Sequence, residues 1–377
     1  MMQPRTIMLV AGARPNFMKV APLIWELRKY PERFHIQLIH TGQHYDAEMS
    51  EVFFQDLELP RPDRFLGVGS GSHAEQTAKI MVAFEQECLG ERPEIVVVVG
   101  DVNSTMACAI TAKKLCIPVA HVEAGLRSRD WSMPEEINRV VTDSISDMLF
   151  TPSRDADQNL MLEGIPGEKI HFVGNVMIDT LLKLLQKTEG SDTLRRFGVE
   201  AGEYTTLTLH RPSNVDDPAV LKGIVEVIVD LARELPIVWP VHPRSRKNLE
   251  KFGFLRLLEA SGGIRLSEPI GYIDMLALNR RARLIITDSG GLQEEATILR
   301  VPCVTLRNNT ERPITVEVGC NQVVGNQPSG IQCAISSALN GNGREIRTPE
   351  FWDDRAAERI VDILKQFLNK KERRPAF

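Results

Sequence analysis

Short runs of β-branched and apolar residues alternate with helical patterns along most of this chain. These runs occupy residues 6–11, 35–41, 95–99, 119–122, 148–151, 170–173, 205–209, 237–241, 284–287 and 301–305. Alternation of this kind is typical of parallel sheets that are covered by helices on both faces. The sequence therefore predicts an α/β protein with Rossmann-like topology.

The number of strands argues for two sheets. It exceeds the number in a closed β/α barrel, and a polar stretch at residues 186–192 interrupts the alternation before it resumes. We therefore expect two open, doubly wound domains in preference to a barrel. The first spans residues 1–175 and the second 176–352, and a final helix at about 353–377 packs back on the first domain.

Composition narrows the class of protein. The 377 residues are 43% hydrophobic and 25% charged with a net charge of −5, so neither nucleic acid nor an anionic membrane surface is an expected partner. Six cysteines without a C-x-x-C pair favour a reducing compartment and argue against zinc. We find no signal peptide and no apolar run near the roughly 20 residues that span a bilayer. We expect a cytoplasmic protein.

The segment 284–296 reads as a buried strand, an Asp-Ser-Gly-Gly turn and the start of a helix. Glycines at a helix N-terminus let a phosphate approach unpaired N–H groups, so the turn is a predicted phosphate site. Glu294 or Glu295 would then accept a hydrogen bond from a sugar hydroxyl of the same nucleotide. The alternative is an ordinary helix start that Ser289 caps, with two solvated glutamates.

Other candidate residues follow the strands of the first half, where open parallel sheets bind ligands. Arg14 and Lys19 follow the first strand and have the charge to reach a diphosphate, although a capping donor and a solvated lysine would look the same. Asp101 and Glu123 each follow an apolar strand. Asp101 has an N-cap role as its alternative, whereas an acid that ends a buried strand is costly unless it is used or paired.

Glu135 and Arg139 have i, i+4 spacing on a predicted helix and would share one face. The alternative for Glu135 is structural, because Ser132-x-x-Glu135 matches a capping box. With the two acids above, three carboxylates are predicted near one cleft.

In the second half, His210 and Arg211 follow a strand and supply a proton donor and a fixed cation. His242 and the arginines of residues 307–312 follow two further strands. The glycines at residues 67–71 follow no strand and lack the spacing of a dinucleotide turn, so we expect no hydride cofactor.

A series of ordered motifs resembles the UDP-N-acetylglucosamine 2-epimerase family. They are Gly-Ala-Arg-Pro at 12–15 with Lys19, Gly-Gln-His at 42–44, Gly-Asp at 100–101, His-Val-Glu-Ala-Gly-Leu-Arg at 121–127, Pro-Glu-Glu-x-Asn-Arg at 134–139, Gly-Asn at 174–175, His-Arg at 210–211, Asp-Ser-Gly-Gly-x-Gln-Glu-Glu-Ala at 288–296 and Thr-Glu-Arg-Pro at 310–313. The resemblance implies a glycosyltransferase-B architecture, in which two parallel sheets face each other across a cleft that binds a UDP-sugar. It also implies a homodimer.

The resemblance further implies an isomerase that interconverts UDP-N-acetylglucosamine and UDP-N-acetylmannosamine for surface polysaccharide synthesis. UDP is expelled to leave a 2-acetamido glycal and is then added back. By resemblance the catalytic residues are Asp101, Glu123, Glu135, His210 and Lys19. The residues that bind the UDP-sugar are Arg14, Arg139, Asn175, Ser289, Gly290, Gly291, Glu295 and Arg312. No metal or cofactor is implied.

Two departures from the family pattern limit the resemblance. Tyr45-Asp46 and Pro212-Ser213-Asn214 replace residues of regulated bacterial members, which puts activation by a second UDP-sugar in doubt. The residues of that second site that remain are Gln43, His44, Glu136, Arg211 and His242.

Four alternatives for the activity stay open. One is a 2-epimerase of another UDP-sugar, such as a 2,3-diacetamido glucuronate, and another is a hydrolysing epimerase. A glycosyltransferase and a non-catalytic UDP-sugar-binding protein are less favoured, because the acidic set is intact.

Overall fold

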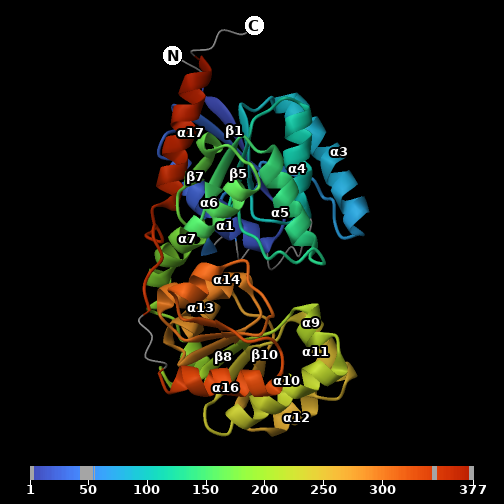
Figure 1. Ribbon diagram of the computed structural model, residues 1–377, viewed down its shortest axis with the longest axis vertical. Helices are drawn as coiled ribbons and strands as arrows, with labels where there is room; N and C mark the ends of the chain where they lie inside the picture. Colours follow the sequence, from blue (N-terminus) through green and yellow to red (C-terminus); the bar gives the residue numbers. More distant parts are fainter. Residues whose placement is uncertain (1–3, 43–53, 55, 342–345, 373–377) are drawn as a thin grey trace. The chain divides into compact units, whose positions relative to one another are not determined.

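The structure, a computed structural model, describes residues 4–42, 54, 56–341 and 346–372 (Figure 1). Two compact units form the chain: Met1–Lys183 with Glu350–Phe377, and Leu184–Pro349. The division falls inside α7 (Val176–Leu185), later in the chain than residue 175. Each unit is built on its own parallel sheet, which confirms the predicted fold class. None of the helices formed by the described residues is long and apolar enough to cross a bilayer.

The N-terminal unit has a seven-stranded sheet in the order β3-β2-β1-β4-β5-β6-β7. Its strands are β1 (Arg5–Ala11), β2 (Phe34–His40), β3 (Arg64–Phe65), β4 (Ile95–Val99), β5 (Val119–Val122), β6 (Met148–Thr151) and β7 (Ile170–Phe172). Its other elements are α1 (Arg14–Leu27), α3 (His73–Glu91), α4 (Asn103–Lys114), α5 (Pro134–Ile145), α6 (Arg154–Leu162), α7, α17 (Ala356–Glu372) and the 3₁₀ turn η1 (Gly167–Lys169). Helices α3, α4 and α5 gather on one side of the sheet and α17 lies on the other (Figure 1). All five residues of β4 are buried as a result.

The C-terminal unit has a six-stranded sheet in the order β10-β9-β8-β11-β12-β13. Its strands are β8 (Thr205–Thr208), β9 (Ile237–Pro240), β10 (Ile264–Ser267), β11 (Leu284–Thr287), β12 (Cys303–Thr305) and β13 (Asn321–Val323). Its other elements are η2 (Gln186–Thr188), α8 (Thr193–Phe197), α9 (Pro212–Val215), α10 (Pro218–Leu231), α11 (Pro243–Lys251), α12 (Leu255–Ala260), α13 (Tyr272–Arg281), α14 (Gly290–Leu299), α15 (Pro313–Glu317) and α16 (Pro328–Leu339). One apolar core contains Trp239 and residues of α10 and α16, and a second contains Tyr204 and residues of α13 and α14. The sheet is therefore covered on both faces.

The segment after the C-terminal unit returns to the N-terminal unit. Helix α17 packs on α1, and Lys365 lies 3.3 Å from the centre of the Tyr30 ring. The carboxylate of Asp179 on α7 accepts hydrogen bonds from the N–H groups of Ala356 and Ala357 at the start of α17, at 3.2 and 2.7 Å. This cap joins the two helices because it satisfies N–H groups that the first turn leaves unpaired.

Gly174 sets how closely the returning segment approaches the sheet. Its φ is +89°, and a Cβ added there would lie 2.0 Å from the carbonyl oxygen of Phe351. Gly164 has a similar φ of +82°, but nothing lies within 4 Å of an added Cβ. Substitutions at both glycines would cause backbone strain, but only a substitution at Gly174 would also cause a steric clash.

We predict that Gly174→Ala lowers the free energy of unfolding more than Gly164→Ala does. The strain of a left-handed alanine costs about 1–2 kcal/mol at either position. The clash with Phe351 adds about 1–3 kcal/mol at Gly174 alone. Urea unfolding followed by tryptophan fluorescence measures both variants, and equal losses would contradict the close approach.

Candidate functional site

Some of the predicted site residues lie where each sheet reverses its strand order. The reversals fall between β1 and β4 and between β8 and β11. Open parallel sheets bind ligands beyond the carboxyl ends of their strands at such points. Asp101 follows β4 in the N-terminal unit, and His210 and Ser289 follow β8 and β11 in the C-terminal unit. Each unit therefore presents its own set of candidate residues at one edge of its sheet.

Glu123 directly follows β5 and forms a buried ion pair with Lys19 of α1. Its φ of +71° is rare for a residue with a side chain, and such conformations concentrate at functional sites. Gly100 makes room for the pair, since an added Cβ would lie 2.8 Å from Lys19 Nζ and 3.4 Å from Glu123 Oε2. The structure therefore brings together one predicted acid and one predicted cation at the end of β5.

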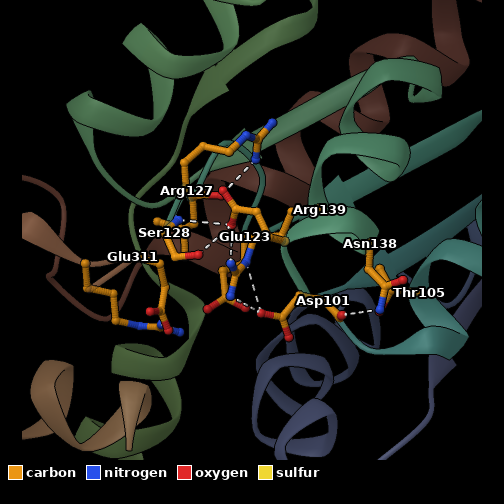
Figure 2. Close-up of polar contacts among 12 residues, drawn as sticks. Asp101, Thr105, Glu123, Arg127, Ser128, Asn138, Arg139 and Glu311 are labelled. Atoms are coloured by element: carbon orange, nitrogen blue, oxygen red, sulfur yellow. Dashed lines mark hydrogen bonds and ion pairs between the residues drawn. The ribbon is translucent and has the colours of Figure 1, made fainter. Parts of the chain in front are cut away.

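Asp101 is held by α5 (Figure 2). Arg139 Nη2 lies 2.6 Å from Asp101 Oδ2, and Arg139 Nε donates to the same oxygen at 3.1 Å. Asn138 Nδ2 donates to the backbone carbonyl of Asp101 at 2.8 Å. The N-cap of α4 is Val102, so Asp101 lies one residue before the N-cap position that was its alternative interpretation. About a quarter of the Asp101 side chain stays exposed, which leaves it open to a ligand.

Glu136 forms a buried ion pair with Arg139. Its carboxylate lies 2.6 Å from Arg139 Nη1 and accepts from the N–H groups of Ser128 and Arg129 at 3.0 and 2.8 Å. Burial alone would raise the pKa of Glu136, but these amides and the guanidinium hold that pKa below its usual value. A fixed anion thereby orients the cation that faces Asp101.

Glu135 lies in the first turn of α5 and is half-buried. The capping-box interpretation is wrong: Met133 is the N-cap, and the Ser132 hydroxyl donates to Asp130 at 2.6 Å instead. Within the described part of the chain, Glu135 forms no hydrogen bond or ion pair. Its carboxylate is therefore not committed to holding the helix.

A buried polar group in the N-terminal unit had no predicted role. His121 of β5 is fully buried, and its ring nitrogens lie 2.6 Å from Asp143 Oδ1 and 2.8 Å from the carbonyl oxygen of Gly100. Asp143 also accepts from Gly125 N at 3.0 Å and pairs with Arg127 at 2.7 Å. His121, Gly125 and Arg127 belong to the motif at residues 121–127, but nothing in the sequence links that motif to Asp143.

Two predicted binding residues of the N-terminal unit give less information. The side chain of Arg14 lies outside the described part of the structure. Asn175 is buried, and its side-chain oxygen accepts from Met177 N at 2.9 Å at the start of α7. This hydrogen bond joins Asn175 to the start of the helix that follows it.

In the C-terminal unit, the Asp-Ser-Gly-Gly turn leads directly into α14. Ser289 is the N-cap, but its side chain makes no cap hydrogen bond, so the interpretation of this serine as a side-chain cap is wrong. Gly290 and Gly291 form the first turn of the helix, which places their N–H groups at its positive end. A Cβ at Gly290 would lie 2.7 Å from Arg312 Nη1, so a larger residue would displace that guanidinium. This helix start has the geometry of an anion site.

His210 is oriented by Asp288, a residue with no role assigned from sequence. Nδ1 of His210 lies 2.8 Å from Asp288 Oδ1, and the backbone N–H groups of His210 and Arg211 donate to the same carboxylate at 2.9–3.1 Å. Burial alone would raise the pKa of Asp288, but His210 and these amides hold it below its usual value. About a third of the His210 side chain is exposed.

Arg312 lies beside the start of α14 in a buried network of charges. Its Nε lies 2.9 Å from Glu294 Oε1, and its Nη1 pairs with Glu311. Glu311 is shared with Arg307, whose Nη2 lies 2.8 Å from it. The charges of the two arginines and the two glutamates balance, so this network holds Arg312 beside the start of the helix without adding net charge.

Glu295 is buried one turn into α14 and accepts a hydrogen bond from the Tyr272 hydroxyl at 3.1 Å. Burial raises the pKa of Glu295 to about 7, and the nearby Glu294 adds to this effect. A further hydrogen-bond donor, such as a sugar hydroxyl, would favour the charged form of this buried carboxylate.

The residues of the second site predicted from the family divide between the units. Gln43 and His44 lie outside the described residues, and Glu136 is used by Arg139. The His242 ring lies 5.6 Å from that of His210, and its Nδ1 accepts from Arg244 N at 3.2 Å as the N-cap of α11. Burial and the neighbouring His210 lower the pKa of His242. Among the described residues, no cluster of His, Cys, Asp or Glu has the arrangement of a metal site.

Comparison with known proteins is consistent with this geometry. The family model for UDP-N-acetylglucosamine 2-epimerase matches residues 26–365. UDP-N-acetylglucosamine 2-epimerase from Methanocaldococcus jannaschii is 46% identical over 361 residues, which cover 94% of this chain and 98% of the relative. The crystal structure of the M. jannaschii enzyme in complex with UDP-GlcNAc and UDP superimposes with a TM-score of 0.88 over 96% of this chain and 99% of that one, at 44% identity.

A relative with another substrate in its name is also similar. UDP-2,3-diacetamido-2,3-dideoxy-D-glucuronate 2-epimerase from Pseudomonas aeruginosa is 39% identical, over 95% of this chain and 99% of the relative. Both relatives are UDP-sugar 2-epimerases, which are isomerases. These matches span nearly the whole chain. The chain belongs to the UDP-N-acetylglucosamine 2-epimerase family.

Proposed function

We propose that this enzyme interconverts UDP-N-acetylglucosamine and UDP-N-acetylmannosamine by inverting C2 of the sugar. The observation that supports the proposal is that the two units hold two different sets of candidate site residues. The N-terminal unit holds carboxylates beside buried cations, and the C-terminal unit holds a helix N-terminus beside a histidine that an aspartate orients. Proton transfer at C2 needs the carboxylates, and departure of UDP needs the donors to its diphosphate.

The first chemical step in this proposal breaks two bonds of the sugar. The C1–O bond breaks, its electron pair leaves with UDP, and a carboxylate of the N-terminal unit takes the C2 proton, so that C1 and C2 become doubly bonded. A second carboxylate then returns a proton to the opposite face of C2, and the UDP oxygen attacks C1. Asp101, Glu123 and Glu135 are the candidates for these transfers, and a positioned acid or base contributes about 10²–10⁴-fold.

The C-terminal unit stabilises the charge that develops on UDP. Ser289 and the N–H groups of Gly290 and Gly291 donate to the diphosphate, and His210 supplies a further donor. The guanidinium of Arg312 lies beside the same turn. In the N-terminal unit, Arg14 and Arg139 are proposed to contact the substrate, and Asn175 completes the proposed binding set.

The relative from P. aeruginosa favours one alternative, a 2-epimerase of a 2,3-diacetamido glucuronate linked to UDP. A hydrolysing epimerase is the second alternative, in which water adds and free N-acetylmannosamine leaves with UDP. We propose a cytoplasmic enzyme that works as a homodimer in the synthesis of surface polysaccharide precursors. All six cysteines are free, which fits a reducing compartment.

Proton NMR of the enzyme with UDP-N-acetylglucosamine in deuterated buffer tests the proposal. We expect an equilibrium mixture of the two UDP-sugars with deuterium at C2. Free N-acetylmannosamine with UDP would indicate the hydrolysing reaction. If neither exchange nor product appears, the same experiment with the diacetamido substrate decides between the two epimerases.

We predict that UDP binding releases a proton near neutral pH through Glu295. The pKa of this group is raised to about 7 in the free protein, so roughly half of it is protonated there. The ribose hydroxyls favour the carboxylate, which lowers its pKa, so affinity rises as the pH increases towards and through 7.

Calorimetry in two buffers with different ionisation enthalpies counts the protons released. Glu295→Gln supplies the control, because the phosphate of UDP also titrates near neutral pH. The variant should release fewer protons than the wild type. Equal release would remove Glu295 from the proposed ribose contact.

A further inference from the structure

His121 is held between two hydrogen-bond acceptors that have no proton to give. One ring nitrogen lies 2.8 Å from the carbonyl oxygen of Gly100, which only accepts. The other lies 2.6 Å from Asp143 Oδ1. Turning the ring over would place C–H groups against both oxygens, so the contacts also fix the ring orientation.

The partners of Asp143 keep it ionised. Its second oxygen accepts from Gly125 N at 3.0 Å and pairs with Arg127 at 2.7 Å. Arg127 in turn pairs with Glu163 at 2.7 Å. An ionised Asp143 cannot donate to the ring, so both hydrogen bonds of His121 need a proton on the ring nitrogen. With a charged His121 ring, this group contains two cations, His121 and Arg127, and two anions, Asp143 and Glu163. Its net charge is then zero.

From these contacts we infer that His121 is doubly protonated and acts as a positioning residue for the turn between Gly100 and Asp101. Gly100 has a φ of +69°, and its N–H donates to the carbonyl of Val122 at 3.0 Å. Its carbonyl oxygen accepts the hydrogen bond from the imidazolium, which holds the backbone one residue before Asp101. The ring joins the end of β4 to β5 immediately before Glu123.

The charge on the ring can be measured without any substrate. In protein labelled with ¹⁵N-histidine at neutral pH, we expect both ring nitrogens of His121 to show the nearly equal shifts of an imidazolium. The signals are assigned by their loss in His121→Phe. His40 is the internal reference in the same spectrum: burial lowers its pKa to about 4, and its Nδ1 accepts from Gly42 N at 2.9 Å. A neutral pattern for His121 would overturn the inference.

The contact with Gly100 has its own readout. Residues 100 and 101 are the one Gly-Asp pair in the sequence, so ¹³C-carbonyl glycine with ¹⁵N-aspartate gives a single correlated signal. We expect this carbonyl to move upfield in His121→Phe. Asp143→Asn removes the anion without removing the donor to Gly100, so it should turn the ring neutral and move the carbonyl less.

Turnover is the third readout, and it rests on the proposed function. We expect kcat for C2 exchange to fall about 10²-fold in His121→Phe, as for a small displacement of a catalytic group. His171→Phe is the matched control, a histidine of β7 in the same sheet whose ring packs 5.7 Å from Phe150. It should leave all three readouts unchanged.

The readouts separate the possible failures. A charged ring with full turnover in His121→Phe would overturn the positioning role and keep the charge assignment. If the wild type shows no exchange with either UDP-sugar, the proposed function fails, and the ring and carbonyl signals still decide whether His121 is charged and holds Gly100. If His121→Phe does not fold, the ring-nitrogen and carbonyl signals of the wild type are compared with those of Asp143→Asn instead.

Discussion

Replacement of Asp101 by Asn, or of Glu123 by Gln, is expected to lower C2 exchange by about 10²–10⁴-fold while UDP still binds. Both substitutions keep the size and polarity of the side chain but remove its capacity to take a proton. The phosphate-binding candidates Ser289, Gly290, Gly291 and His210 lie in the other unit and are unchanged. Exchange is measured by proton NMR in deuterated buffer, and UDP affinity by calorimetry.

Asp147→Asn is the matched control for Asp101→Asn. Asp147 precedes β6 and pairs with Lys113 at 2.8 Å, and it accepts from Val119 N at the start of β5. It is therefore an ion-paired aspartate at the opposite end of the same sheet. The control should retain wild-type turnover, and wild-type turnover in Asp101→Asn and Glu123→Gln as well would remove both acids from the chemistry.

The same pair of substitutions also tests how the acids divide the work. Glu123 forms a buried ion pair with Lys19, whereas Asp101 shares Arg139 with Glu136 and keeps about a quarter of its side chain exposed. A residue that only takes the C2 proton from one epimer should block washout of the label from that epimer and spare exchange from the other. Following each UDP-sugar separately therefore assigns each acid to a face of the sugar.

The longer strands and their terminal residues could be predicted because the chain has a strong local pattern there. Residues 95–99 are continuously apolar, and the acid that follows them lies at the end of β4 as expected. Strand β3 was missed because it has only two residues, and β13 because only one of its three residues is apolar. Strand β10 was missed because two of its four residues, Arg265 and Ser267, are polar and no apolar run marks it.

The errors at helix starts have a different cause. The capping-box pattern at Ser132 fits the spacing rule, yet its hydroxyl bonds to Asp130, two residues before it. Serine hydroxyls choose among several nearby partners, and sequence spacing cannot rank them. The same limit applies to Ser289, which occupies the N-cap position without making the side-chain bond.

The residues that hold the site residues in place through hydrogen bonds or ion pairs could not be predicted from the sequence. Asp288 was visible only as a turn residue, and its bond to His210 joins residues far apart in the sequence. The contacts of His121 with Asp143 and Gly100 are of the same kind. The contacts of His210 with Asp288 and of His121 with Gly100 depend on which strands are neighbours, since β8 pairs with β11 and β4 with β5. The contact of His121 with Asp143 depends on the packing of α5 against β5. Strand order is a long-range property that local patterns do not carry.

His210→Gln is expected to lower kcat by about 10²–10³-fold, the usual cost of one donor to a developing anion. His210 is the candidate donor to the departing diphosphate, and Asp288 orients its ring through Nδ1, which leaves Nε2 for the ligand. The effect should appear in kcat more than in the affinity for UDP, because the negative charge on the bridging oxygen grows as the C1–O bond breaks.

Asp288→Asn should give a smaller loss in the same direction. The variant keeps a side-chain oxygen near Nδ1 but removes the negative charge that pairs with the ring. Asp274→Asn is the matched control, an aspartate of α13 that pairs with Arg196 at 2.9 Å and accepts from the Thr193 hydroxyl at 2.7 Å. It should retain full turnover. If His210→Gln raises KM and leaves kcat unchanged, the histidine binds UDP equally in the ground state and the transition state, and the departing oxygen takes its stabilisation from the start of α14 alone.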